Sequence, residues 1–150
     1  MVESLYIDQY FMNLACKESD NSNCRRHVGA VLVKNNVVLA TGYNAAPIGI
    51  KSCQEYGICM RQRDNIKSGT MQEYCRAVHA EQNAIISAAR CGIPIEGSTI
   101  YVTTYPCSIC ARMLINCRFK RIVYDGDYFD WNSHNMLEES GIAIEKIIRK

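Results

Sequence analysis

The sequence has none of the features that mark a secreted, membrane-embedded or strongly charged protein. Glu3 and Asp8 lie near the start, and no basic segment leads into an apolar run, so we expect no signal peptide. The longest stretch of apolar residues and glycine near the front covers only residues 28–33, which is too short to span a bilayer. With 17 Lys and Arg against 15 Asp and Glu, the net charge is +2. This balance favours neither a membrane nor a nucleic-acid partner.

What the sequence does have is an ordinary globular composition and many cysteines. Its 150 residues are 48% hydrophobic and 21% charged, which predicts one folded domain over residues 1–150 with a substantial core. The nine cysteines are an odd number, and without a secretion signal they do not predict a disulfide scaffold. We therefore expect a cytoplasmic protein whose thiols are metal ligands, nucleophiles or small core residues.

Hydrophobic periodicity predicts an opening helix, a hairpin, and then alternating strands and helices. Asn35 and Asn36 suit the tight turn of the hairpin. This order favours an α/β fold, namely a three-layer α/β/α sandwich on a five-stranded mixed sheet, with an antiparallel N-terminal hairpin followed by parallel strands. The expected helices are residues 4–18, 79–90, 107–116 and 133–140, and the expected strands are residues 28–33, 37–41, 99–104, 121–124 and 142–148.

One long segment, residues 44–75, shows no clear periodicity and holds three of the nine cysteines. A structureless loop of that length is uncommon in a compact domain unless it is functional or fixed by other bonds. The segment therefore needs an explanation of its own.

Three side chains with metal-binding chemistry lie at the starts of two predicted helices. Cys107 and Cys110 are three residues apart, so both sulfurs lie on one face of the first helical turn, where the helix dipole favours thiolates. His79 begins the other helix and offers a neutral imidazole. Three protein ligands leave one tetrahedral position open, which is typical of a catalytic zinc site.

Glu81, two residues after His79, is close enough to reach a water bound to such a metal. Zinc lowers the pKa of bound water to about 7, and a carboxylate can carry the released proton to a substrate nitrogen. Taken singly, the two cysteines could be a redox pair and His79 a capping or core residue. Together, a His-x-Glu followed by Pro-Cys-x-x-Cys is the known signature of zinc deaminases.

Several stretches between residues 24 and 128 resemble the deoxycytidylate (dCMP) deaminase family, which has the cytidine-deaminase-like fold. The zinc motif alone indicates only the wider superfamily of nucleoside and nucleobase deaminases. The Gly-Tyr-Asn stretch and the Val-His-Ala-Glu-x-Asn-Ala-Ile stretch narrow the resemblance to the dCMP branch. The matching stretches are residues 26–33, 40–44, 75–85, 95–97, 101–103, 106–107, 110 and 120–124.

The resemblance implies hydrolytic deamination of dCMP to dUMP and ammonia, which supplies dUMP for thymidylate synthesis. Water activated by zinc would attack C4 of cytosine, and Glu81 would protonate N3 and then the leaving amine. The backbone N–H of Ala80 would hold the base O2, and the carbonyl near Tyr105 would accept from the 4-amino group.

The resemblance also assigns residues to the sugar and the phosphate. Asn44 matches a sugar-contacting asparagine and Tyr128 an aromatic residue near the nucleotide, although a turn residue and rim packing are the alternatives. The phosphate needs a cation or N–H donors. Arg26 is the preferred candidate over Arg76, and an ordinary solvated charge is the alternative for either.

Four more cysteines, Cys24, Cys53, Cys59 and Cys75, flank the hairpin and the long loop. Several dCMP deaminases carry a second, structural zinc that holds this insertion, and four thiolates would suit such a closed site. The alternative is four buried free thiols. The remaining three, Cys16, Cys91 and Cys117, are expected to be packing residues.

Regulation and assembly are implied by the resemblance alone. Many members are homo-oligomers, often hexamers, that dCTP activates and dTTP inhibits, and Mg²⁺ is expected only with such a nucleotide effector. Ala45 stands where the family usually has glycine, and its Cβ would restrict a backbone that needed positive φ. Rival functions are deamination of dCTP, deoxycytidine or another nucleobase, and a non-catalytic, competence-associated zinc protein, for which Glu81 would be unnecessary.

Overall fold

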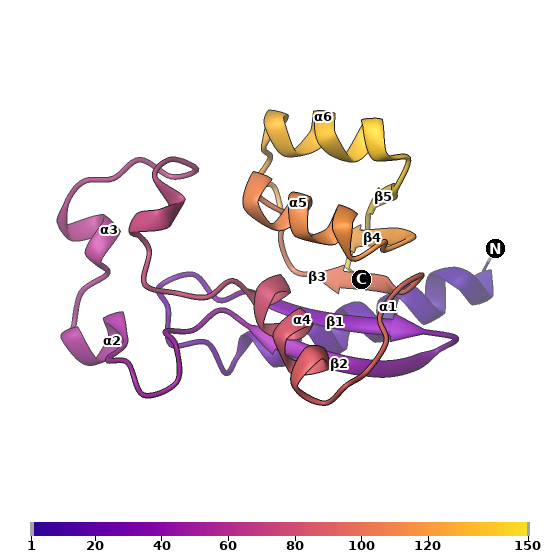
Figure 1. The fold of residues 1–150 in the computed structure, drawn as a ribbon, viewed down its shortest axis with the longest axis horizontal. Helices are drawn as coiled ribbons and strands as arrows, with labels where there is room; N and C mark the ends of the chain where they lie inside the picture. The colour runs from indigo at the N-terminus through magenta and orange to yellow at the C-terminus, as the bar shows by residue number, and fades with distance from the viewer. Residues whose placement is uncertain (1, 150) are drawn as a thin grey trace.

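In the computed structural model, which describes residues 2–149, five strands form one mixed sheet in the order β2-β1-β3-β4-β5 (Figure 1). β1 pairs antiparallel with β2 and with β3, whereas β3, β4 and β5 run parallel. The predicted mixed sheet with an antiparallel hairpin is therefore confirmed. The strands are β1 (Gly29–Lys34), β2 (Val37–Tyr43), β3 (Thr99–Val102), β4 (Arg121–Tyr124) and β5 (Ala143–Lys146).

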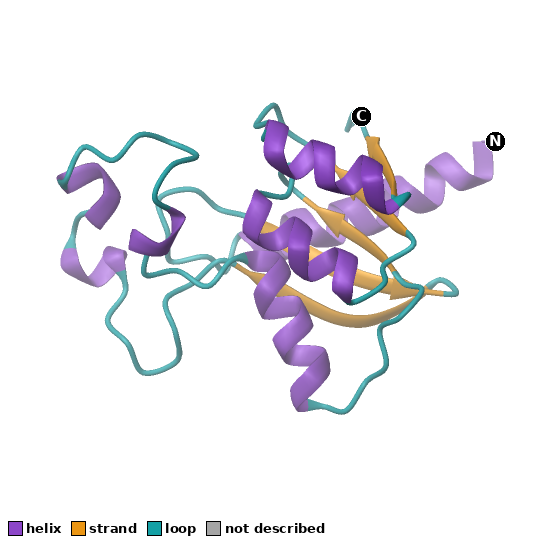
Figure 2. Ribbon diagram, turned by 45° about the horizontal axis from the view of Figure 1, so that its top comes forward, coloured by secondary structure: helices purple, strands orange, loops and turns teal. Residues whose placement is uncertain are grey.

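Helices cover both faces of the sheet, as the three-layer prediction requires (Figure 2). α1 (Val2–Ser19) packs on one face, and α4 (Ala80–Arg90), α5 (Ser108–Asn116) and α6 (Trp131–Ser140) cover the other. The side chains of β1 alternate between the two layers because successive strand residues point to opposite faces. Ala30 and Leu32 pack with α4 and α5, whereas Val31 and Val33 pack with α1.

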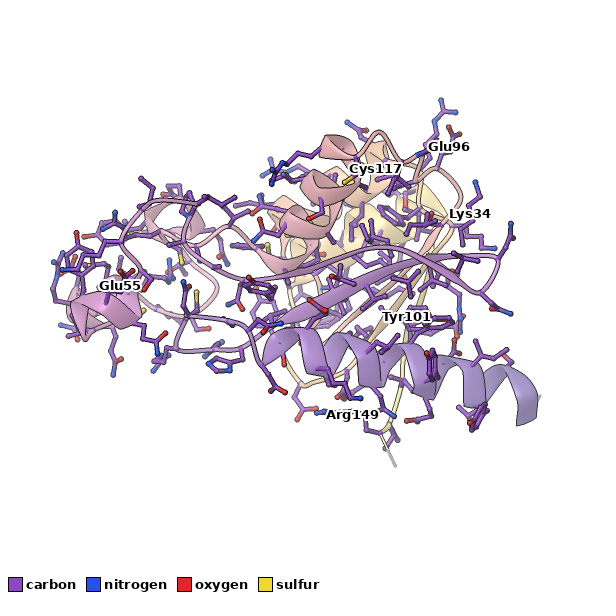
Figure 3. All side chains as sticks on the ribbon, turned by 90° about the horizontal axis from the view of Figure 1, so that it is seen from below. Lys34, Glu55, Glu96, Tyr101, Cys117 and Arg149 are labelled. Carbon is purple, nitrogen blue, oxygen red and sulfur yellow. The ribbon has the colours of Figure 1, made fainter. Side chains whose placement is uncertain are left out.

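A partly buried ion pair joins α1 to the sheet. Asp8 of α1 accepts two hydrogen bonds from the Arg121 guanidinium, both at 2.8 Å, and one from the Tyr101 hydroxyl at 2.7 Å. Tyr101 lies on the α1 side of the sheet in Figure 3, and Cys117 lies with α5 on the opposite side. Burial alone would raise the pKa of Asp8, but the hydrogen bonds from Arg121 and Tyr101 lower it below its ordinary value.

The hairpin turn follows the expected chemistry. Asn35 and Asn36 both have positive φ, 51° and 60°, which a two-residue type I′ turn requires and which asparagine tolerates better than most residues. Lys34 then donates to the Glu96 carbonyl at 2.7 Å, and Figure 3 shows these two residues together at this end of the sheet.

Most element boundaries differ from the prediction by one or two residues. α4 and α5 begin one residue late because His79 and Cys107 are their N-caps, outside the helices proper. α6 begins at Trp131, two residues early, because Asp130 is its N-cap. β3 and β5 are shorter than expected, and β2 continues to Tyr43.

The segment without periodicity is a small lobe beside the sheet (Figures 1 and 2). We call residues 46–77 the helical lobe; it contains α2 (Cys53–Tyr56), α3 (Met60–Arg63) and the 3₁₀ turn η1 (Gln72–Tyr74). None of these three elements has a buried residue. Elements this short cannot show a helical period, which is why the sequence pattern did not reveal them.

The base of the lobe is closed by the backbone. Ala45 and Val78 form an isolated antiparallel bridge, with N–H to O distances of 3.1 and 2.8 Å. Ala45 is not among the residues with positive φ, so its Cβ causes no backbone strain of the kind considered above. Within residues 2–149, no helix combines the length and the apolar character that crossing a membrane requires.

Candidate metal centre and substrate cavity

The three predicted metal ligands converge between the starts of α4 and α5. The Nδ1 atom of His79 lies 3.5 Å from the Cys107 sulfur and 3.4 Å from the Cys110 sulfur. Among the residues that the structure describes, this is the one group of His, Cys, Asp or Glu ligands that all lie within 4.8 Å of one another. A tetrahedral zinc with ordinary Zn–S and Zn–N bonds would hold such atoms roughly 3.6 Å apart. The donor set and its spacing therefore fit zinc.

His79 is held in place by the first turn of α4. Its backbone N–H donates to the Gln82 side-chain oxygen at 2.8 Å, and the Asn83 amide donates to the Tyr43 carbonyl at 2.7 Å. α4 also packs closely on β2 at Gly42, where a Cβ would lie 2.3 Å from the Ala84 nitrogen. Sequence reasoning missed these residues, although a glutamine three positions after a helix start is a recognisable capping signal.

The two cysteines are held from the other side by α6. Asp130 accepts from the Ser108 backbone N–H at 2.9 Å and from its hydroxyl at 2.6 Å, and its second oxygen accepts from Ser133 N–H at 3.0 Å. The buried Ser133 hydroxyl donates to the Pro106 carbonyl at 2.7 Å. One carboxylate thus bonds the first turns of both α5 and α6, and so fixes the turn that carries Cys107.

The ionisation of the site is uneven. Hydrogen bonds from Cys110 and His79 outweigh burial and lower the pKa of Cys107 to about 4, whereas the bond to Cys107 and burial raise the pKa of Cys110. The Cys107 thiolate also raises the pKa of His79. A metal ion bound here would replace the shared protons, because thiolate and neutral imidazole are the ligating forms.

Glu81 lies beside these ligands without being one of the close set. Its side chain is almost fully buried, at 3% exposure. Burial, with the nearby Cys107 thiolate, raises the pKa of its carboxyl. A buried carboxyl with a raised pKa next to a metal site is suited to hold and release a proton.

A cavity of about 510 Å³ opens in front of the metal site. This volume suits a nucleotide-sized ligand. Its walls include His79, Glu81 and Cys107, while Cys110 is fully buried behind them. All five predicted substrate residues line the same cavity, namely Arg26, Asn44, Ala80, Tyr105 and Tyr128.

Two of these residues are already engaged in the fold. The Asn44 side chain accepts from Val28 N–H at 2.8 Å and donates to the Arg26 carbonyl at 2.7 Å, so it links the end of β2 to the segment before β1. The Tyr105 ring is buried, packs on Tyr124 and Phe129, and its hydroxyl lies 3.3 Å from His134 Nδ1. Neither histidine outside the metal site had a predicted role, and this contact gives one to His134.

The backbone and charges of the cavity favour an anionic ligand. Ala80 is the first residue of α4, where backbone N–H groups have no partner within the helix. Four arginines line the cavity, namely Arg25, Arg26, Arg61 and Arg76, whereas Glu81 is the one acidic residue among the described lining. The excess of positive charge suits a phosphorylated substrate.

The four other loop-flanking cysteines gather on one wall of this cavity. Cys24, Cys53, Cys59 and Cys75 are all partly buried free thiols in the lining. Burial, followed by the proximity of the other three, raises the pKa of Cys24 to about 11. Their sulfurs do not form a group as tight as the first site within the described residues.

The remaining three cysteines are only partly explained by packing. Cys16 and Cys117 pack against the two hydrophobic clusters of the core. Cys91 is exposed at the C-cap of α4, so the packing prediction is wrong for this residue. Hydrophobic periodicity does not predict whether a residue at the very end of a helix, such as Cys91, is buried or exposed.

Comparison with known proteins agrees with this geometry. Residues 5–125 match the family model described as the cytidine and deoxycytidylate deaminase zinc-binding region. The chain is 35% identical over 143 residues to deoxycytidylate deaminase of Schizosaccharomyces pombe, covering 94% of this chain and 44% of that protein. It thus spans less than half the length of that relative. It is 32% identical over 149 residues to ComE operon protein 2 of Bacillus subtilis, covering 97% of this chain and 74% of that protein.

A solved structure shows the same fold. The dCMP deaminase of cyanophage S-TIM5, in complex with dCMP and dUMP, aligns with a TM-score of 0.76 and 29% identity over 95% of this chain and 97% of that one. The metal ligands, the buried Glu81 and the match over most of the chain lead to one conclusion. The chain belongs to the cytidine and deoxycytidylate deaminase zinc-binding family.

Proposed function

We propose that this protein is a zinc-dependent deaminase that converts dCMP and water to dUMP and ammonia. The observation that carries the proposal is the buried Glu81 carboxyl, placed next to a His-Cys-Cys site at the end of a cavity rich in arginine. A site that only stabilised the fold would need neither the open cavity nor a buried acid beside the ligands. The relatives named deoxycytidylate deaminase support the choice of substrate.

His79, Cys107 and Cys110 would hold the zinc. When bound, the zinc acts as a Lewis acid that lowers the pKa of a coordinated water to about 7. Glu81 then accepts a proton from the attacking water and delivers it to N3 of cytosine as the C4–O bond forms. Glu81 would then take the remaining proton from the new C4 hydroxyl and deliver it to the 4-amino group, so that the C4–N bond breaks, the C4 carbonyl forms and ammonia leaves.

The cavity walls would orient the base. The free N–H of Ala80, at the positive end of α4, would donate to the base O2. The backbone carbonyl near Tyr105 would accept from the 4-amino group, and the burial of Tyr105 keeps this segment fixed. Tyr128 would pack along the nucleotide from the opposite wall.

The far end of the cavity would bind the sugar and the phosphate. The Asn44 amide keeps one further N–H, beyond its bond to the Arg26 carbonyl, for the deoxyribose. We assign the phosphate to Arg26, which lines the cavity and is exposed enough to reach a charged ligand.

We also propose a second, structural zinc held by Cys24, Cys53, Cys59 and Cys75. Their position on one wall and their mutual influence on the pKa of Cys24 support this assignment. Four thiolate ligands would stabilise a lobe that has no buried side chain in its helices. Metal analysis of the purified protein tests it: two zinc ions per chain are expected, and one zinc with four freely titratable thiols would refute it.

The wider setting follows the family. We propose a cytoplasmic homo-oligomer, with a hexamer as the expected state, and dCTP and dTTP as its effectors, with Mg²⁺ bound only through them. The nine unpaired cysteines support a reducing compartment. Light scattering with and without each nucleotide measures the oligomer, and a monomer under all conditions would exclude the hexamer.

The substrate assignment is tested by following the loss of cytosine absorbance with dCMP, dCTP, deoxycytidine and CMP in parallel. We expect dCMP to have the highest kcat/KM. A higher kcat/KM for dCTP or deoxycytidine would support the deamination mechanism but would show that dCMP is not the preferred substrate. No turnover of any of the four by zinc-loaded protein would favour the non-catalytic alternative.

A further inference from the structure

One segment of the helical lobe forms part of the cavity wall. Ile66, Ser68 and Gly69 line the cavity, as does Tyr128, which follows β4. A Cβ built on Gly69 would lie 3.6 Å from the Tyr128 hydroxyl. We call residues 66–71 the cover segment, because they meet Tyr128 across the cavity.

The cover segment has little apolar packing of its own. Residues 67–71 are all exposed, and no residue of α2, α3 or η1 is buried. The backbone is also strained here, since Asn65 and Met71 have positive φ of 53° and 46°. Non-glycine residues in this region cost free energy and persist only where the surroundings impose them. Something polar must therefore hold the segment in place.

The Arg61 side chain supplies that restraint. Its Nη1 donates to the Met71 carbonyl at 2.5 Å, and its Nη2 donates to the carbonyls of Lys67, at 2.9 Å, and Thr70. The Arg61 backbone carbonyl also accepts from Ile66 N–H at 2.8 Å. One residue of α3 thus bonds both ends of the cover segment.

Two of the carbonyls that Arg61 holds are also acceptors for backbone N–H groups. The Lys67 carbonyl accepts from Thr70 N–H at 3.2 Å, and the Met71 carbonyl accepts from Tyr74 N–H at 3.1 Å. The guanidinium therefore fixes the acceptors on which the turns of the segment depend. A lysine cannot reproduce this arrangement, because its ammonium is a point donor without the planar fork of arginine.

The neighbouring arginine of the same helix shows the contrast. Arg63 pairs with Asp64 at 2.8 Å and does not line the cavity. Arg61 takes part in no ion pair among the described side chains: its guanidinium bonds neutral carbonyls, and its charge faces the cavity and weakly opposes the rise in the pKa of His79 that Cys107 causes. The two residues offer a matched pair for mutagenesis.

We propose that Arg61 is a positioning residue that holds the cover segment over the bound nucleotide. The proposal rests on the proposed nucleotide substrate of this cavity. Arg61 acts through the backbone of residues 66–71, not through the reacting atoms. Its loss therefore weakens nucleotide binding and leaves the chemical step at the metal site intact.

The test compares Arg61→Ala, Arg61→Lys and the control Arg63→Ala with the unchanged protein, all loaded with zinc. For Arg61→Ala we expect KM for dCMP to rise about tenfold to a hundredfold, as the loss of charge-assisted hydrogen bonds implies, with kcat within about threefold. The KM of Arg61→Lys should lie between those of Arg61→Ala and the unchanged protein. The KM and kcat of Arg63→Ala should match those of the unchanged protein.

Amide hydrogen exchange gives a readout that does not depend on turnover. In Arg61→Ala the Thr70 and Tyr74 amides should exchange faster, while amides of β1 and β3 keep their protection. Unchanged exchange at Thr70 and Tyr74 would overturn the proposal, as would faster exchange with an unchanged KM, or a fall in kcat alone. If the wild-type protein deaminates no cytosine nucleotide, the proposed function fails. The exchange measurement needs no turnover, so it still tests separately whether Arg61 restrains the cover segment.

Discussion

The layered sheet and the helical lobe are stabilised in different ways. The sheet buries aliphatic side chains on both faces, and a partly buried ion pair between Asp8 and Arg121 joins α1 to it. The lobe buries no side chain in its short helices and is held by helix caps and by hydrogen bonds from Arg61. The metal site belongs to the first region, and one wall of the cavity belongs to the second. In the proposed function, the reaction and the enclosure of the substrate are therefore divided between a well-packed part and a weakly packed part.

The largest expected effect lies in the sheet region, at Glu81. Glu81→Gln should lower kcat for dCMP about a hundredfold to ten-thousandfold, because an amide cannot carry the proton. The zinc content should stay the same, since Glu81 is outside the close ligand set. Kinetics with metal analysis on the same sample measure both. Full turnover by this variant would refute the proton-transfer role.

Gly42 tests how tightly the sheet region is packed. An alanine there would place its Cβ 2.3 Å from the Ala84 nitrogen and 2.5 Å from the Ala80 carbonyl oxygen, so α4 must move. We expect Gly42→Ala to reduce the free energy of unfolding by about 3 kcal/mol, at the upper end for overpacking. Urea denaturation measures this value. A change below the error of that measurement would mean that β2 and α4 are less rigidly joined than their contact implies.

The ion pair of α1 should make the sheet region sensitive to acid. The pKa of Asp8 is lower in the folded protein than its ordinary value of 3.8. The stabilisation of the fold by the ionised Asp8 carboxylate is therefore complete above pH 3.8 and is lost as the pH falls through the lower pKa of the folded state. Asp8→Asn should cost about 1–2 kcal/mol near neutral pH. The difference from the unchanged protein should vanish in acid.

A pH series of urea denaturation follows the Asp8 effect. Glu145→Gln is the control, because Glu145 bonds the same Arg121 but its side chain is 52% exposed. A constant penalty for Asp8→Asn from neutral to acidic pH would contradict the assigned linkage.

The smallest global effect is expected in the lobe. Gly57 ends α2 with φ of 76°, and nothing lies within 4 Å of a Cβ built there. Gly57→Ala should cost about 1 kcal/mol from backbone strain alone. If the lobe opens independently, this loss appears as faster exchange of lobe amides such as Ile58, while global denaturation stays unchanged. An equal loss in global denaturation would show that lobe and sheet unfold together.

The same division explains what could be predicted from the sequence. The sheet and its covering helices follow from periodicities of two and about four residues, and the metal ligands lie in two short motifs at helix starts. Asp130 and Ser133 were missed because their partners, Ser108 and Pro106, are more than twenty residues away along the chain. Their role depends on how α5 and α6 pack.

The lobe was the least predictable part for a physical reason. Four-residue helices have no period, and the acceptors of Arg61 are backbone carbonyls, which every sequence contains. Cys24, Cys53, Cys59 and Cys75 predict a zinc that would hold the segment. The cysteines could not indicate the role of Arg61, because its hydrogen-bond partners are backbone carbonyls, which do not depend on residue type.

The bridge between Ala45 and Val78 has a consequence for how such proteins can diversify. Because the two ends of the lobe are bonded to each other, the stretch between them is a cassette whose length and composition can change without displacing Asn44 or His79. Exchange of residues 46–77 for a different insert would redesign the entrance to the cavity and leave the metal centre where it is.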